Sequence, residues 1–370
     1  MSDPEPFSIS VPDQVLADLR ERLGRTRWPE LSGSHGWELG ADVPYLRRLC
    51  EHWAARYDWR TTEARLNALP NYRWGGIHLW DVRGGGGGHP VMLIHGWPGA
   101  VLEFEALIPL LVEAGHDVVV PSLPGFGFSE APEPPVGVVG VADRLRALMD
   151  ALGHDTYAVQ GGDWGAAIAA RMAFDDPERV AGVHVNAVGV LPVPGDFSEP
   201  PMSDAEAEYA STGRRWRTRE GFHLFVQGTA PDGLAVGLAD SPAGLAAWLV
   251  EKYRRWSDCG GEVERRFSAD QLCDYLTLYW ATGTIGSSMR LYAAEARDRW
   301  RLAPGERISA PAAAADFPRE IVRPPREWAE RIFADLRSWT EMPRGGHFAA
   351  HEEPELLAED VLGFLAGLEG

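Results

Sequence analysis

The stretch Tyr157-Ala-Val-Gln-Gly-Gly-Asp-Trp-Gly165 constrains the fold of this chain more than any other. An apolar run typical of a buried strand ends at Gly161-Gly162, and Asp163 follows it. Residues 165–174 are small and apolar, as in a helix packed closely on a sheet. A strand, a tight glycine-flanked turn and a helix form a nucleophile elbow, which presents one side chain at the top of an α/β sheet. The pattern predicts an α/β fold organised around Asp163.

The central residue of this elbow is an aspartate, where the usual Gly-x-Ser-x-Gly pattern has a serine. A serine would indicate an esterase or lipase, whereas a carboxylate forms an alkyl ester by displacement at a saturated carbon. The alternative is that Asp163 only caps the following helix. Residues elsewhere in the chain are needed to decide between the two.

Composition excludes several classes of protein. A chain of 370 residues with 45% hydrophobic and 24% charged residues is typical of a globular enzyme with one core and insertions. A net charge of −19 disfavours nucleic acid and anionic membranes as partners, because both require a basic face. Cys50, Cys259 and Cys273 are widely spaced, which indicates reduced thiols, no metal site and a cytoplasmic protein.

No segment has the pattern of a signal peptide or of an apolar span long enough to cross a membrane. We therefore expect a cytoplasmic protein without a membrane anchor, and a homo-oligomer is compatible with the sequence. Lys252 is the only lysine among 35 basic residues, a bias associated with bacterial genomes of high GC content.

Hydrophobic periodicity divides the chain into four parts. Residues 1–88 contain a helical meander with two amphipathic helices, followed by the first sheet strands. The apolar faces of these helices must pack on a later part of the chain. Residues 89–195 and 301–370 carry the two parts of an α/β core. Strands are predicted at 72–83 (a hairpin), 90–94, 118–120, 157–161, 180–185, 308–315 and 338–342. Their alternation with helices predicts a mostly parallel sheet flanked by helices.

Residues 196–300 interrupt that alternation, because they are rich in Trp, Tyr, Arg and Leu at helical spacings. An all-helical insertion after the sixth predicted strand would lie over the edge of the sheet to which the elbow points. We expect this segment to be a cap over the site.

An ester on Asp163 leads to turnover only if water activated by a base later hydrolyses it. His347, in Arg344-Gly-Gly-His-Phe348, follows the last predicted strand, and the chain order nucleophile, acid, histidine fits an α/β-hydrolase. The acid that orients this histidine is Asp316 or Glu320, and spacing alone does not choose between them. The turn His95-Gly-Trp-Pro98 can direct the backbone N–H of Trp97 to the same point as that of Trp164, which would form an oxyanion hole.

Several further motifs are spread along nearly the whole chain. Together with the elbow they are Phe7-x-Ile9-x-Val11-Pro12, His95-Gly-Trp-Pro-Gly99, Gly161-Gly-Asp-Trp-Gly165, Asp240-Ser-Pro242, Tyr279-Trp280-x-Thr282, Ser287-Ser288-x-Arg290-x-Tyr292, Gly345-Gly-His-Phe-Ala-Ala350 and Glu353-Pro-Glu-Leu-Leu357. Through these motifs the chain resembles the microsomal-type epoxide hydrolases. The resemblance implies conversion of an epoxide to a vicinal diol with water and without a cofactor. It also implies that Glu320, in Phe317-Pro-Arg-Glu320, is the acid.

The resemblance further implies two cap tyrosines that donate a proton to the epoxide oxygen. Tyr292 matches one of them, whereas His223, beside Phe222, stands at the position of the other. Both His223 and Phe222 are candidate substrate contacts. If His223 assists as an imidazolium, ring opening should weaken as the pH rises past its pKa.

Two other functions fit the same elements. A haloalkane or haloacid dehalogenase shares the Asp, His and acid, but a halide leaving group needs no proton from Tyr292. A non-catalytic small-molecule binding protein is the other, motivated by the changed cap position. Aromatic residues expected near the site favour a bulky or lipophilic substrate. Detoxification and natural-product biosynthesis are both roles that fit such a substrate.

Overall fold

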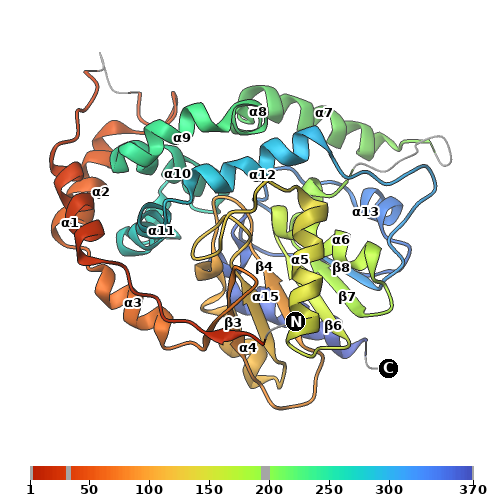
Figure 1. Cartoon of the computed structure of the whole chain (residues 1–370). Coiled ribbons are helices and arrows are strands. Elements are labelled where there is room, and N and C mark those ends of the chain that lie inside the picture. Colours follow the sequence, from red (N-terminus) through yellow and green to blue (C-terminus); the bar gives the residue numbers. More distant parts are fainter. Residues whose placement is uncertain (1–2, 31–34, 193–200, 369–370) are drawn as a thin grey trace.

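The computed structural model describes residues 3–30, 35–192 and 201–368. Its nine-stranded sheet has the order β1-β2-β3-β5-β4-β6-β7-β8-β9, and helices cover it (Figure 1). The strands are β1 (Glu5–Pro6), β2 (Asn71–Trp74), β3 (Ile77–Val82), β4 (Val91–Ile94), β5 (Val118–Pro121), β6 (Tyr157–Gly161), β7 (Val180–Val185), β8 (Ala312–Asp316) and β9 (Leu336–Glu341).

The first strands pair antiparallel, from β1 through β2 and β3 to β5, and the other pairs are parallel. Strand β4 is buried along its whole length, as expected of a central parallel strand covered on both faces. Its last residue, Ile94, is in register with Gly161 at the end of β6. The loops after β4 and β6 therefore leave the sheet side by side, and the predicted α/β-hydrolase fold is confirmed.

The core helices are α4 (Leu107–Glu113), α5 (Val138–Ala151), α6 (Trp164–Asp175), α13 (Arg326–Ile332), α14 (Ala349–Glu352) and α15 (Pro354–Ala366). Helix α6 follows the elbow, and Ala166, Ala169 and Ala170 on it are fully buried. Small side chains allow this helix to pack closely on the strands beside it, as the sequence predicted.

The predicted strands match the observed ones except at their ends. The strand predicted from residue 308 begins at Ala312, and Ile308 makes only an isolated bridge to Phe333. Pro311 explains the difference, because proline has no backbone N–H to donate to a neighbouring strand. The two-residue strand β1 was not predicted, so the sixth predicted strand is β7.

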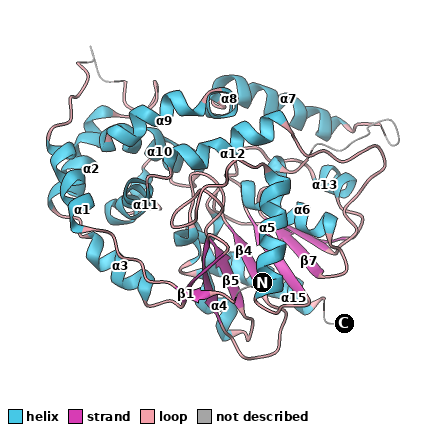
Figure 2. Cartoon of the chain, in the orientation of Figure 1, coloured by secondary structure: helices cyan, strands magenta, loops and turns pink. Residues whose placement is uncertain are grey.

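Among the described residues, six α-helices stand between β7 and β8 in the chain, and the helical layer that they form extends over the sheet (Figure 2). They are α7 (Asp204–Arg219), α8 (Phe222–Thr229), α9 (Pro231–Asp240), α10 (Pro242–Trp256), α11 (Ala269–Thr282) and α12 (Ile285–Arg297). Residues 196–200 of the expected cap lie outside the described residues. Among the described helices none is by itself long and apolar enough to cross a membrane, although α9 and α10 together, with a bend of 118° between them, reach that length and composition.

The N-terminal helices α1 (Asp13–Gly24), α2 (Val43–Ala55) and α3 (Trp59–Asn67) lie against the cap helices α10 and α11 (Figure 1). The indole N–H of Trp53 donates to Thr277 Oγ1 at 2.8 Å. Asp274, on α11, accepts from the Tyr57 hydroxyl at 2.7 Å and from Arg65 at 2.6 Å. The apolar faces of the N-terminal helices thus pack on the cap, which is the later part of the chain that the sequence required.

Candidate active site

Asp163 occupies the turn between β6 and α6 in a strained backbone conformation. Its φ of 49° and ψ of −130° make it the only residue other than glycine with a positive φ in the described ranges. Such conformations are sparsely populated and persist where the surrounding structure enforces them. Two neighbouring glycines allow the close approach, because a Cβ on Gly165 would lie 1.8 Å from the Ile94 carbonyl oxygen and one on Gly96 would lie 2.3 Å from Asp163 Cβ.

Replacing Gly165 with alanine is therefore expected to destabilise the protein and to displace Asp163. Overpacking of this kind costs roughly 1–3 kcal/mol of folding free energy. Chemical denaturation and epoxide turnover measure the two effects. Gly363→Ala, in the open surface of α15, is the matched control, since a Cβ there meets no atom within 4 Å. Equal stability of the two variants would show that the elbow is not closely packed.

Three side chains from separate loops meet at the end of β6. His347 Nε2 lies 3.4 Å from Asp163 Oδ2, and His347 Nδ1 lies 2.7 Å from Glu320 Oε1. Asp316, the other candidate acid, instead pairs with Arg323 at 2.8 Å. The structure thus brings together Asp163, His347 and Glu320 and leaves Asp316 in a separate ion pair.

The charge of His347 is controlled by its two carboxylate neighbours. Burial opposes the imidazolium form, but the Glu320 and Asp163 carboxylates outweigh burial and raise the pKa of His347 well above its usual value. The histidine is therefore protonated while Asp163 is ionised. An ester on Asp163 would remove one of these two charges and lower the pKa again.

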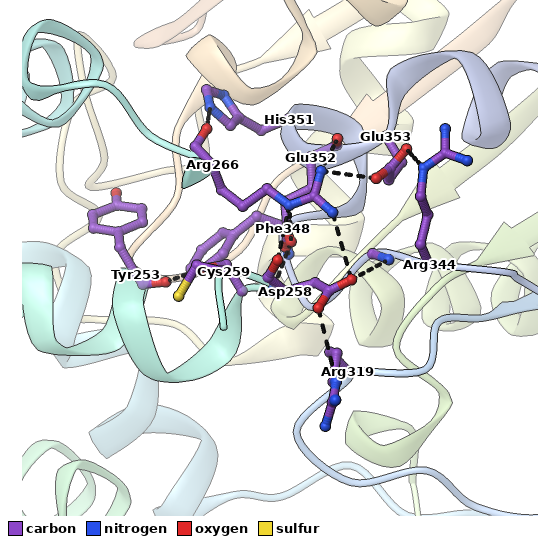
Figure 3. Close-up of polar contacts among 12 residues, drawn as sticks. Tyr253, Asp258, Cys259, Arg266, Arg319, Arg344, Phe348, His351, Glu352 and Glu353 are labelled. Carbon is purple, nitrogen blue, oxygen red and sulfur yellow. Dashed lines mark hydrogen bonds and ion pairs between the residues drawn. The ribbon is translucent and has the colours of Figure 1, made fainter. Parts of the chain in front are cut away.

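The loop that carries His347 is held by the cap as well as by the core. Asp258 Oδ2 accepts the N–H of Gly345 at 3.1 Å, and the N–H of Asp258 donates to Glu352 Oε2 at 2.6 Å. Glu352 Oε1 also accepts the N–H of Phe348 at 3.0 Å. Figure 3 shows Arg266, from the cap, reaching between these groups. The position of the base thus depends on the contact between cap and core.

The loop after β4 directs a backbone donor at the nucleophile. The N–H of Trp97 donates to Asp163 Oδ1 at 2.7 Å. Trp164 is the first residue of α6, where backbone N–H groups have no partner within the helix. The Trp97 N–H thus points at Asp163, and an oxyanion hole made by Trp97 and Trp164 stays a prediction.

Tyr292, on α12, closes the site from the cap side. Its ring meets the Trp164 ring edge to face at 4.8 Å between centroids and the Trp97 ring at 5.8 Å. Burial, followed by the Asp163 charge, raises the pKa of Tyr292 well above its usual value. The phenol therefore keeps its proton at neutral and moderately alkaline pH.

His223, on α8, is buried beside Tyr292 and stacks on Trp97, with ring centroids 5.9 Å apart and an interplanar angle of 10°. Burial, followed by the Lys252 charge, lowers the pKa of His223 to about 3. The side chain is thus neutral near pH 7, which disfavours the alternative in which His223 donates a proton as an imidazolium.

Phe222 does not contribute to the site. Its side chain is 42% exposed and packs on Trp248, with Lys252 Nζ 3.9 Å from its ring centroid. It is also not part of the lining of the cavity at Asp163. The adjacent residues Phe222 and His223 face different directions because successive residues of a helix are about 100° apart.

Two cavities meet at Asp163. The larger has a volume of ≈ 520 Å³ and extends from Asp163 and Tyr292 past Trp216 and Trp300. The smaller has a volume of ≈ 20 Å³, which is enough for one water molecule, and lies at Asp163 and His347. Asp163 therefore faces a space large enough for a small-molecule substrate on one side and a space of water size on the other.

Two residues of the site were not found from the sequence. Glu103 lines the smaller cavity, and burial raises its pKa to about 8. Trp256, at the end of α10, packs on His347 with 5.2 Å between the two ring centroids. Glu103 and Glu105 are the two acids in the otherwise apolar segment that follows Gly99, and this pair was the available signal.

Comparisons with known proteins identify the family to which the chain belongs. Residues 4–104 match the family described as epoxide hydrolase N terminus, and residues 89–253 match the α/β hydrolase fold family. Epoxide hydrolase 1 of the pig, Sus scrofa, is 34% identical over 404 residues, which cover 98% of this chain and 89% of the pig protein.

Solved structures of epoxide hydrolases superpose on nearly the whole chain. Juvenile hormone epoxide hydrolase from the silkworm Bombyx mori has a TM-score of 0.87 and 29% identity, with coverage of 100% of this chain and 95% of the silkworm chain. The Aspergillus niger epoxide hydrolase has a TM-score of 0.85 and 27% identity, with coverage of 99% and 97%. The similarity therefore extends through the N-terminal helices, the core and the cap alike, and the chain belongs to the epoxide hydrolase family.

Proposed function

We propose that this epoxide hydrolase acts through a covalent alkyl ester on Asp163, which His347 and Glu320 then hydrolyse. The observation that carries the proposal is the position of Asp163, whose carboxylate faces the Trp97 N–H and His347 at the junction of the two cavities. A carboxylate that only capped α6 would not need this strained turn, and the Asp163 side chain makes no capping hydrogen bond.

In the first step Asp163 attacks one epoxide carbon and the carbon–oxygen bond of the ring breaks. The departing oxygen takes the hydroxyl proton of Tyr292. General acid catalysis of this kind accelerates the bond-breaking step by roughly 10²–10⁴-fold. A halide would leave without that proton, so the buried Tyr292 hydroxyl supports an epoxide as the substrate.

In the second step water in the smaller cavity attacks the ester carbonyl carbon and gives its proton to His347. Esterification removes the Asp163 charge and so lowers the pKa of His347, which makes the histidine a base when a base is required. The N–H groups of Trp97 and Trp164 stabilise the oxyanion of the tetrahedral intermediate. On collapse the ester carbon–oxygen bond breaks and the departing oxygen takes the second proton of the attacking water, which releases the diol and restores the Asp163 carboxylate. The proton that His347 released on esterification replaces, by way of solvent, the one that Tyr292 gave to the epoxide oxygen.

An isotope experiment tests the covalent step. In a single turnover with excess enzyme in ¹⁸O-water, the first diol should carry unlabelled oxygen, because that oxygen comes from the Asp163 carboxylate. The same enzyme, returned to ordinary water, should then give labelled diol. Label in the first diol would mean direct attack by water and would exclude the ester.

A further inference from the structure

Three arginines line the larger cavity at its solvent-exposed end. Arg214 and Arg217 belong to α7, and Arg299 follows the end of α12. In the part of the chain that the structure describes, their guanidinium groups have no ion-pair or hydrogen-bond partner. A group of three such cations is notable in a chain whose net charge is −19, because acids are abundant elsewhere on the surface.

The helical register of α7 selects which of its arginines face the cavity. Ala210, Gly213, Arg214 and Arg217 all line it, and residues three or four apart share one face of a helix. Arg215 is outside the lining and instead bonds with its own helix, at Ser211 Oγ and Thr212 Oγ1. Only the arginines on one face of α7 therefore line the cavity.

The nearby acid offsets part of the charge of Arg299 but forms no ion pair with it among the described residues. Glu295 also lines the cavity, but its two carboxylate oxygens accept the backbone N–H groups of Val138 at 2.9 Å and Trp300 at 3.0 Å. Burial lowers the pKa of Arg299, and the neighbouring Arg217 charge lowers it further, against the opposing effect of Glu295. An anion bound between Arg217 and Arg299 would relieve this repulsion.

The two ends of the cavity differ in character. Asp163, Tyr292 and His223 lie at the end where the ring would open, and Tyr292 and His223 are buried. The rest of the lining is largely apolar and includes Trp216, Leu224 and Trp300. A ligand complementary to the whole space has a reactive end, an apolar body and an anionic end.

We infer that the preferred substrate is a lipophilic epoxide that carries a carboxylate remote from the ring, held by Arg214, Arg217 and Arg299. The planar guanidinium group suits a carboxylate because it can donate two parallel hydrogen bonds to the two oxygens. The inference rests on the proposed reaction at Asp163 and adds the class of substrate to it.

A matched pair of substrates tests the inference on the unmodified enzyme. A long-chain fatty acid with a mid-chain epoxide and its methyl ester differ only in the charge of the distant group. We expect kcat/KM to be at least ~10-fold higher for the acid, the order expected of charge-assisted hydrogen bonds. The preference should shrink in high salt, which screens partly exposed charges.

Variants assign the preference to the arginines. The double variant Arg217→Ala, Arg299→Ala should lose most of the preference for the acid and retain turnover of the methyl ester, whereas Arg215→Ala should change neither. Equal or faster turnover of the ester by the unmodified enzyme would overturn the inference and leave the proposed reaction intact. A double variant that keeps the preference, or loses both substrates equally, would overturn it too. Failure of the enzyme on every epoxide would refute the proposed function itself.

Discussion

Replacing His347 with glutamine is expected to stop turnover and to leave the enzyme as a stable ester of its substrate. His347 is 3.4 Å from Asp163 and pairs with Glu320, so glutamine removes the base while ring opening still has Asp163 and Tyr292. Loss of a base from a triad of this kind costs ~10³-fold or more in turnover. Intact-mass measurement after mixing with an epoxide should show an adduct of the mass of one substrate molecule.

The adduct must be located to make this result decisive. Adding Asp163→Ala to the His347→Gln variant should abolish the adduct, because the ester has no other attachment point in the proposed site. Glu320→Gln should slow hydrolysis less than His347→Gln does. Glu320 orients His347 and raises its pKa, but it does not itself accept the proton of the water. A His347→Gln variant that turns over normally, or never becomes alkylated, would contradict the assignment of the histidine to the second step alone.

The same step has a predictable pH dependence. Esterification lowers the pKa of His347, and only the neutral imidazole can accept a proton from water. Where hydrolysis limits the rate, turnover should therefore rise with pH until His347 of the ester is deprotonated and should then level off.

Local sequence predicted the elbow because its requirements are local. Asp163 needs a turn that only nearby glycines permit, and Gly161 and Gly165 lie two residues before and two residues after it in the sequence. The parallel strands were found for a related reason, since strands buried on both faces are continuous apolar runs. The start of β8 was predicted too early because the apolar run continues through Pro311, whose missing N–H ends the pairing.

Features that depend on distant contacts could not be predicted in the same way. Sequence spacing left Asp316 and Glu320 equivalent, and the structure separates them because Arg323 pairs with Asp316. The neutral state of His223 arises from burial between α8 and the loop after β4, which the sequence of α8 does not specify. The grouping of Arg217 with Arg299 likewise requires α7 and the end of α12 to meet across the cavity.

Replacing Tyr292 with phenylalanine is expected to slow ring opening by at least ~10²-fold, the size of effect expected for loss of a general acid. An alkoxide is strongly basic, and the site around Tyr292 is lined by Trp97 and Trp164 rather than by water-exposed donors. The step is best measured in the His347→Gln background, where the rate of ester formation reports ring opening without the later hydrolysis.

His223→Phe is the matched control for this measurement, because phenylalanine can keep the stacking on Trp97 and removes only the imidazole nitrogens. With a pKa of about 3, His223 is neutral across the working range, so its loss should slow ester formation less than the loss of Tyr292 and should not change the pH profile near neutrality.

The pKa of Tyr292 is raised by burial, so ester formation in the unmodified cap should also show no loss of rate as the pH passes from 6 to 8. Near-normal ester formation by Tyr292→Phe would remove the tyrosine from the donor role. A decline in rate that only His223→Phe abolishes would assign that role to the histidine and would show that substrate binding restores its charge.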